Sequence, residues 1–217
     1  MLKHAAVVLC ALPLLSALPA CSKAYYKTME VFGSEKRDIL ADRVNDAQKS
    51  QTEAKEQFAS ALDRFSKVVN AGDTELRKAY DRAKADLDRS KAKADAVHNR
   101  IKSVEEVGND LFDEWNDELK QYSKDELRDR SRRQMQDTRA RFDQMLAAMK
   151  KSEASMKPVL DTFSDTVLML KHTLNAEAVA TLRNTVSDLE KDVRTLIREM
   201  ERSIAESDKF INDLKKQ

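Results

Sequence analysis

Apolar residues recur at alternating spacings of three and four from residue 35 to the end of the 217-residue chain. This spacing puts them on one face of a helix, and helices with such faces pack along a narrow seam. Ile197, Ile204 and Ile211 widen the last stripe into a face that suits a bundle of several helices. The clearest run in that stripe is Val179, Leu182, Val186, Leu189, Val193, Leu196 and Met200.

Capping residues divide this pattern into four helices. Gly72 suits a left-handed C-cap, and Ser123 with Glu126 forms a capping box that would open the third helix. Because the turns are short, consecutive helices are antiparallel neighbours. We therefore predict an all-α fold, an elongated antiparallel four-helix bundle or coiled coil, with helices over about residues 34–70, 74–121, 123–174 and 175–214.

Two local features modify this picture. Pro158 lies in the middle of the third predicted helix, where it offers no N–H to the carbonyl of Ala154 and crowds it. We predict a kink there, with a functional hinge as the alternative. The second and third helices are also the longest, so their shared turn should extend beyond the other two helices, with residue 35 opposite about 110 and residue 214 opposite about 136.

Composition supports the all-α fold. The chain holds only three Gly and three Pro, whereas β-sandwiches and doubly wound folds need many turns. Charged residues make up 35% of the chain and aromatic residues 6%, a balance that favours long solvated helices over a large globular core.

The first segment has the character of a targeting signal. Lys3 precedes an apolar stretch that is too short to span a bilayer comfortably. It ends in Leu18-Pro19-Ala20-Cys21, which resembles the bacterial lipobox in all but Pro19. An ordinary secretory signal is the alternative. We predict a signal peptide over residues 1–20, an N-terminal segment over 21–34 anchored by acyl chains on Cys21, and a helical domain over 35–217.

The cysteines agree with an anchor, because removal of residues 1–20 leaves Cys21 as the only thiol. Three acyl chains bind a membrane far more stably than one. Ser22 follows the cysteine, and in Gram-negative sorting an Asp at this place typically retains a lipoprotein in the inner membrane. The expected location is therefore the cell envelope, at the outer membrane facing the periplasm.

Charge argues against nucleic acid as a partner. Loss of residues 1–20 removes Lys3 and no acid, so 39 basic and 38 acidic residues become 38 of each. Nucleic-acid-binding domains instead carry a basic excess.

One local asymmetry stands out within this balance. Residues 105–118 hold seven acids and no base, and residues 128–141 hold six Arg and two Asp. Because the two runs flank one turn, we favour a charge zipper that sets the register of the hairpin; the alternative is an arginine patch free for lipid phosphates or an acidic partner. The candidate interaction surface comprises Phe112, Trp115, Tyr122, Arg128, Arg130, Arg132 and Arg133.

The sequence carries no recognisable reaction chemistry. His98 and His172 lie on different predicted helices without a di-iron Glu-x-x-His pattern, and no phosphate-binding glycine loop is present. The methionines of the third helix fit core packing better than metal binding. We therefore predict no catalytic residue, no cofactor and no metal site.

Several strings carry a family resemblance over nearly all of the chain after the signal. They are KRDILADRV (36–44), LFDEWNDEL (111–119), EASMKPVL (153–160), LKHTLNA (170–176) and LIREMERSIAESDKFI (196–211). Through them the chain resembles an uncharacterised bacterial lipoprotein family catalogued as a domain of unknown function, number twenty-nine fifty-nine. The resemblance implies a lipid anchor on Cys21 and an all-helical domain, and it implies no activity.

Together these features predict a non-enzymatic, membrane-tethered helical scaffold or protein-interaction lipoprotein with an envelope protein as its partner. The alternative function is a periplasmic carrier that opens the bundle to bind an apolar molecule or a metal.

Overall fold

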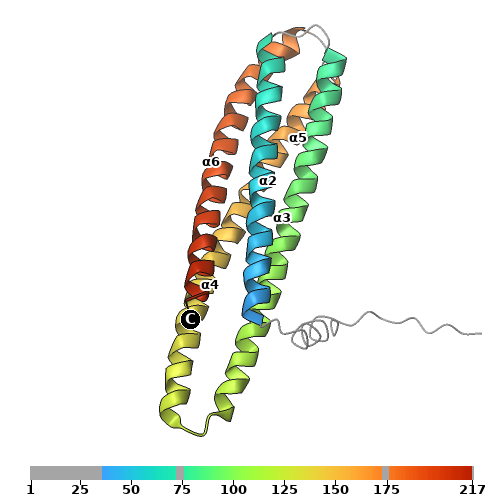
Figure 1. Cartoon of the computed structure of the whole chain (residues 1–217). Helices are drawn as coiled ribbons and strands as arrows, with labels where there is room; N and C mark the ends of the chain where they lie inside the picture. Colours follow the sequence, from blue (N-terminus) through green and yellow to red (C-terminus); the bar gives the residue numbers. More distant parts are fainter. Residues whose placement is uncertain (1–35, 72–75, 173–175, 217) are drawn as a thin grey trace, which may run out of the picture. The chain divides into compact units, whose positions relative to one another are not determined.

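The computed structural model describes residues 36–71, 76–172 and 176–216 (Figure 1). The described residues belong to one compact unit, Glu35–Gln217. The predicted signal peptide, the N-terminal segment and Cys21 lie outside the described residues.

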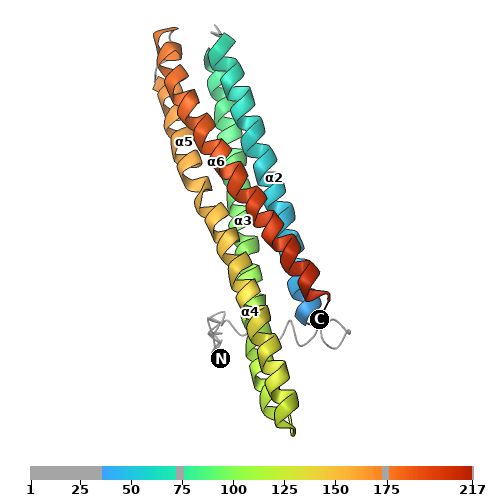
Figure 2. The same cartoon turned by 90° about the vertical axis from the view of Figure 1, so that its left-hand side faces the viewer.

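The compact unit is a four-helix bundle, as predicted. The α2 helix packs against α3 and α6, and both α4 and α5 pack against α3 and α6 (Figures 1 and 2). The described residues contain no strand. The elements in chain order are α2 (Lys36–Ala71), α3 (Leu76–Glu118), the 3-10 turn η1 (Leu119–Gln121), α4 (Asp125–Ala154), α5 (Met156–His172) and α6 (Ala176–Leu214).

The predicted seam of the last helix forms part of the core. Ile211 is buried, and Ile197 and Ile204 are half-buried, as expected for a widened stripe. Within the described residues, no helix combines the length and apolar character that a bilayer crossing requires. The buried seam residues on α6 are Leu182, Val186, Leu189, Val193, Leu196 and Met200.

The third predicted helix is interrupted at Ser155, which separates α4 from α5. The backbone N–H of Ser155 donates to the Lys151 carbonyl at 3.2 Å, and its hydroxyl donates to the Ser152 carbonyl at 2.7 Å. Pro158 is the third residue of α5 and has no N–H for the carbonyl of Ala154. The predicted kink is confirmed.

The predicted capping box at Ser123 and Glu126 is wrong. The α4 helix begins at Asp125, and Lys124 occupies the N-cap in extended conformation with no side-chain cap hydrogen bond. Tyr122 is also extended, so Ser123 lies outside the helix. Asp125 and Glu126 in the first turn stabilise the helix N-terminus by their charge instead.

Candidate functional site

The α3–α4 hairpin extends beyond the ends of the other helices (Figures 1 and 2). Lys36 at the start of α2 pairs with Glu114 at 2.7 Å, and Asp213 near the end of α6 pairs with Arg141 at 3.4 Å. The predicted overshoot is confirmed, although α2 reaches about one turn farther along α3 than expected and α6 stops about one turn earlier along α4. We call residues 115–140 the tip and the remaining four-helix section the body.

The interior of the tip is organised around Trp115. Its indole N–H donates to the hydroxyl of Ser131 at 3.0 Å, which joins α3 to α4. The guanidinium of Arg37 lies 4.8 Å from the indole ring centre, so the first turn of α2 covers this side chain. Trp115 is only 6% exposed and Phe112 only 3%. Both candidates therefore lie in the interior and do not form the outer surface.

Phe142 marks the junction of tip and body. Its ring centre lies 5.5 Å from that of Phe112 and 5.9 Å from that of Phe210, so three helices meet on one side chain. Gly108 makes this approach possible, because a Cβ there would overlap the Phe142 ring, with even Cε1 only 2.8 Å away. The absence of a side chain at Gly108 therefore allows α3 and α4 to approach closely here.

Three arginines of the run pair within α4, where a charge zipper across the hairpin was expected. Arg128 pairs with Asp125, Arg132 with Asp129 at 2.7 Å, and Arg139 with Asp143 at 3.6 Å, all within α4. Each of these acids lies three or four residues from its arginine, on the same face of α4, so these pairs need no contact across the hairpin. Across the hairpin, Glu105 of the acidic run pairs with Lys150 at 2.6 Å, and the guanidinium of Arg139 donates to the amide oxygen of Asn109 at 3.5 Å.

Two of the candidate arginines fit the alternative interpretation, an arginine patch at the surface. Arg130 and Arg133 are exposed and make no ion pair within the described part of the chain. On α3, Asp110 and Asp113 likewise make no ion pair among the described residues. The tip and its base thus carry unpaired charges of both signs on neighbouring helices.

A shallow open groove of about 470 Å³ lies where the tip joins the body. Met135 and Ala140 supply apolar surface beside the buried ring of Phe112. Asp113, Arg139 and Asp143 supply charges, and Asn116 and Gln136 complete the lining. The guanidinium of Arg139 lies 4.9 Å from the Phe112 ring centre. The groove can accept a side chain that has both an apolar body and a polar end.

The far end of the hairpin exposes apolar side chains. Tyr122 is 38% exposed and Leu127 is 47% exposed, and the third large exposed apolar side chain of the described residues is Leu168 on α5, at 53%. Of the three aromatic candidates, Tyr122 alone lies at the surface. Sequence reasoning missed Leu127, an apolar residue that directly follows the two acids in the first turn of α4.

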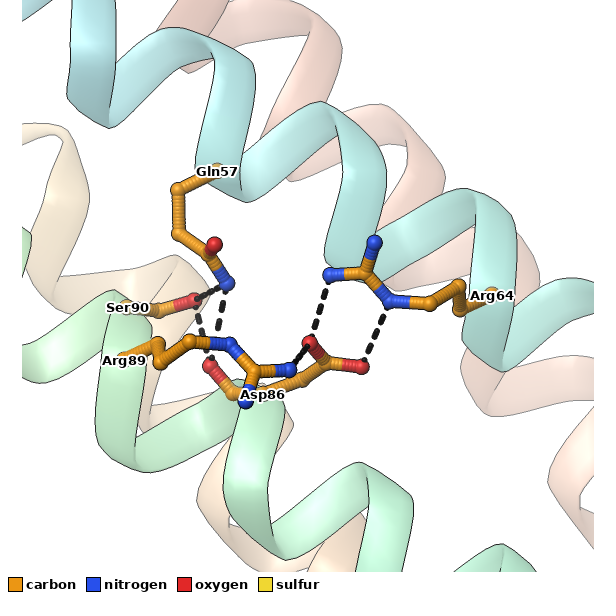
Figure 3. A network of polar contacts seen from close by, with 5 residues as sticks. All are labelled: Gln57, Arg64, Asp86, Arg89 and Ser90. Carbon is orange, nitrogen blue, oxygen red and sulfur yellow. Dashed lines mark hydrogen bonds and ion pairs between the residues drawn. The ribbon is translucent and has the colours of Figure 1, made fainter.

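A polar cluster on Asp86 links α2 to α3 in the body (Figure 3). Arg64 contacts both carboxylate oxygens, with Nε donating at 2.9 Å, and Arg89 donates to one of them. Burial raises the pKa of Asp86, but the hydrogen bonds from Arg64 and Arg89 outweigh it and hold that pKa below its ordinary value. The same pair raises the pKa of Arg64.

The backbone of this cluster is also engaged. Gln57 donates to the Asp86 carbonyl at 3.3 Å, and the Ser90 hydroxyl donates to it at 2.8 Å. The polar groups of the Asp86 cluster form hydrogen bonds and ion pairs with one another. The cluster is therefore a structural link between α2 and α3.

A second polar layer lies deeper, at Gln51. Its amide donates to the hydroxyls of Ser152 at 2.7 Å and Ser203 at 3.0 Å, so that α2, α4 and α6 are joined. All three side chains are fully buried, next to the break at Ser155. Sequence reasoning did not single out Gln51, because its partners lie on helices that are distant in the chain.

The remaining candidates for chemistry have structural surroundings. His98 is exposed with Nδ1 2.6 Å from Glu153, and His172 is exposed at the end of α5. The described residues hold no group of three His, Cys, Asp or Glu side chains that could bind a metal. Met145, Met149 and Met156 are buried in the core, as core packing predicts.

The model of the family described as a protein of unknown function (DUF2959) matches residues 25–214. The chain belongs to this family. A search of the curated proteins found no match. The DUF2959 match covers all of the bundle helices, the tip included.

Proposed function

We propose that this DUF2959 protein is a non-enzymatic lipoprotein of the bacterial cell envelope, anchored by acyl chains on Cys21, whose tip is its interaction end. The observation that carries the proposal is the tip itself. It extends past α2 and α6, exposes Tyr122 and Leu127, and bears arginines without ion pairs among the described residues.

The position of α2 makes an anchor on Cys21 compatible with this role. Lys36 pairs with Glu114, so the polypeptide enters the bundle at the base of the tip. The segment between Cys21 and Lys36 can span up to ~50 Å when extended. That length lets an acylated Cys21 hold the tip near the periplasmic face of the outer membrane, the location that Ser22 favours.

The ionisable groups support a non-enzymatic role. Each described group with a shifted pKa belongs to an ion pair. Lys93 lowers the pKa of Glu53. Lys84 lowers the pKa of Asp88, and Asp88 raises the pKa of Lys84. Acids and bases poised for catalysis more often owe their shifts to a cleft and a reacting partner. The carrier alternative has less support, because Met145, Met149 and Met156 fill the core.

The anchor is tested with Cys21→Ser in the full chain. We expect the wild type to fractionate with membranes and to carry acyl mass on its N-terminal peptide, and the variant to lose both. Wild-type protein that is recovered soluble with an unmodified Cys21 would contradict the anchor.

The interaction end is tested by photo-crosslinking in cells. A benzoylphenylalanine replaces Tyr122 in one strain and Leu168 in a matched control, because both positions are exposed but lie at different ends of the helices. We expect protein adducts from position 122 and few from position 168. The reverse pattern would contradict a role for the tip.

A further inference from the structure

We propose that the tip binds the tip of a second copy of this chain, in an antiparallel arrangement about a two-fold axis. The inference rests on the proposed role of the tip as the interaction end, and it names the partner. Four features of the hairpin support it: its missing neighbours, its charges, its groove and the apolar side chains at its far end.

The tip lacks the neighbours that complete the body. In the body each helix packs against two others, whereas α4 has no α6 beside it before Arg141 and α3 has no α2 beside it after Trp115. A helix pair with one open side gains stability when a second pair covers it. A second tip supplies a helix pair of the same length.

The charges favour another copy over an unrelated surface. Trp115 of α3 lies level with Ser131 of α4. When two tips overlap in antiparallel order about their midpoints, Arg130 and Arg133 of one copy therefore run alongside Asp110 and Asp113 of the other. These four side chains make no ion pair among the described residues of their own chain. Opposite charges at matched positions guide the approach of two surfaces and select their register.

In this antiparallel overlap, the exposed apolar side chains of one tip also lie level with the groove of the other. Leu127 and Ala140 are separated by thirteen residues of α4, or ~20 Å along the helix. Tyr122 and Leu127 at the far end of one tip then reach the groove at the base of the other, which Phe112, Met135 and Ala140 line. A two-fold axis fills both grooves at once, because each copy offers the same knob and the same groove.

The expected interface is small. An overlap of ~25 Å by two helices, each about 10 Å across, covers on the order of 500 Å² per copy. This area is below the ~800 Å² per partner of a stable complex, so we expect a weak dimer in solution. Attachment of both copies to one membrane raises their effective concentration and makes this weak contact effective.

The partner is identified by crosslinking in cells that express two differently tagged full-length copies. Benzoylphenylalanine replaces Tyr122 at the far end or Gln136 in the groove, and Leu168 serves as the control position. We expect an adduct that carries both tags from the first two positions and not from the third. Peptide mapping should join position 122 of one copy to residues 135–143 of the other.

Each other outcome of this experiment overturns the inference. Adducts of position 122 with a different protein or with lipid would exclude the second copy as the partner while leaving the tip as the interaction end. Adducts from Leu168 alone would overturn both the inference and the proposed function.

A charge-swap experiment tests the arrangement itself. One variant carries Arg130→Glu with Arg133→Glu, and the other carries Asp110→Arg with Asp113→Arg. Each variant paired with itself sets like charges together, whereas the two variants paired with each other are complementary at both contacts of the two-fold dimer. We expect the self-adducts to fall by roughly tenfold or more and the mixed adduct to persist.

Folding and specificity are controlled separately. Thermal unfolding of each variant, followed by circular dichroism, should match the wild type, because the exchanged residues are charged and make no ion pair among the described residues. Arg198→Glu, on the exposed surface of α6, should leave the crosslink unchanged. Self-adducts of the first variant at wild-type yield would overturn the antiparallel arrangement.

Discussion

The body and the tip are built from different segments of α3 and α4, with different numbers of neighbouring helices. In the body, Phe58, Leu196, Met200 and other fully buried side chains fill the space between four helices. In the tip, two helices meet over Trp115, and Arg37 from α2 covers its ring. The stability of this bundle therefore depends on the number of helices around a side chain, because each added neighbour removes more apolar surface from water.

Polar groups show the same contrast. The body encloses Gln51, Ser152 and Ser203 and satisfies each of them inside the core. The tip leaves its arginines at the surface, paired locally or unpaired among the described residues. Fully satisfied buried polar groups favour one arrangement of the helices in the body, whereas the charges of the tip remain in contact with water.

The largest expected effect is at the junction of the two regions. Phe142→Ala removes a ring that contacts Phe112 and Phe210, and it leaves a cavity beside Gly108. We expect the free energy of unfolding to fall by about 3–5 kcal/mol in urea titrations. Tyr122→Ala is the exposed aromatic control and should change it by less than about 0.5 kcal/mol. Similar losses for the two variants would remove the distinction between junction and tip.

The polar layer of the body gives the next largest effect. Gln51→Ala opens a cavity and leaves the hydroxyl of Ser203 without its amide partner, and we expect a loss of about 2–3 kcal/mol. Gln51→Leu keeps most of the volume and should lose less. Urea unfolding of both variants checks this order, and equal losses for the two variants would show that the hydrogen bonds matter more than the volume.

Asp86→Asn tests the ion-pair cluster and its pH dependence. At pH 7 we expect a loss of about 1–2 kcal/mol, because the charged bonds to Arg64 and Arg89 are weakened. The pKa of Asp86 is lower in the folded protein than its ordinary value of 3.8, so the contribution is complete above about pH 4 and declines as the pH falls through the folded pKa.

The measurement compares unfolding of wild type and Asp86→Asn at pH 7 and at pH 3. The difference between the two proteins should be smaller at pH 3. Asp161→Asn, which weakens the exposed pair with Lys157, is the control and should cost less than about 0.5 kcal/mol at either pH. An equal difference at both pH values would assign the effect to packing alone.

Pro158→Ala tests the break between α4 and α5. The substitution offers an N–H to the carbonyl of Ala154, and we expect the free energy of unfolding to rise by about 1 kcal/mol. Thermal unfolding measures it. A fall instead would mean that the packing of Met156 and Phe163 depends on the bend.

The smallest effects belong to the tip arginines. Arg130→Ala and Arg133→Ala should each change the free energy of unfolding by less than about 0.5 kcal/mol, because neither side chain makes an ion pair within the described residues. Arg64→Ala, which breaks the link to Asp86, is the body counterpart and should cost more. Equal losses at all three positions would show that the tip arginines have structural partners.

Sequence alone determined the helical periodicity, the four-helix count, the break near Pro158 and the projection of the α3–α4 hairpin. These features follow from spacing and helix length along one chain, and local chemistry is sufficient to specify them.

Tertiary structure alone decided which side chains those patterns bring together. It set the ring of Phe142 against rings from two other helices. It also buried Trp115 beneath Arg37 and placed Gln51 between two serines from distant helices. Such choices depend on the rotation of each helix about its own axis, which side-chain packing among all the helices sets and periodicity in one helix does not.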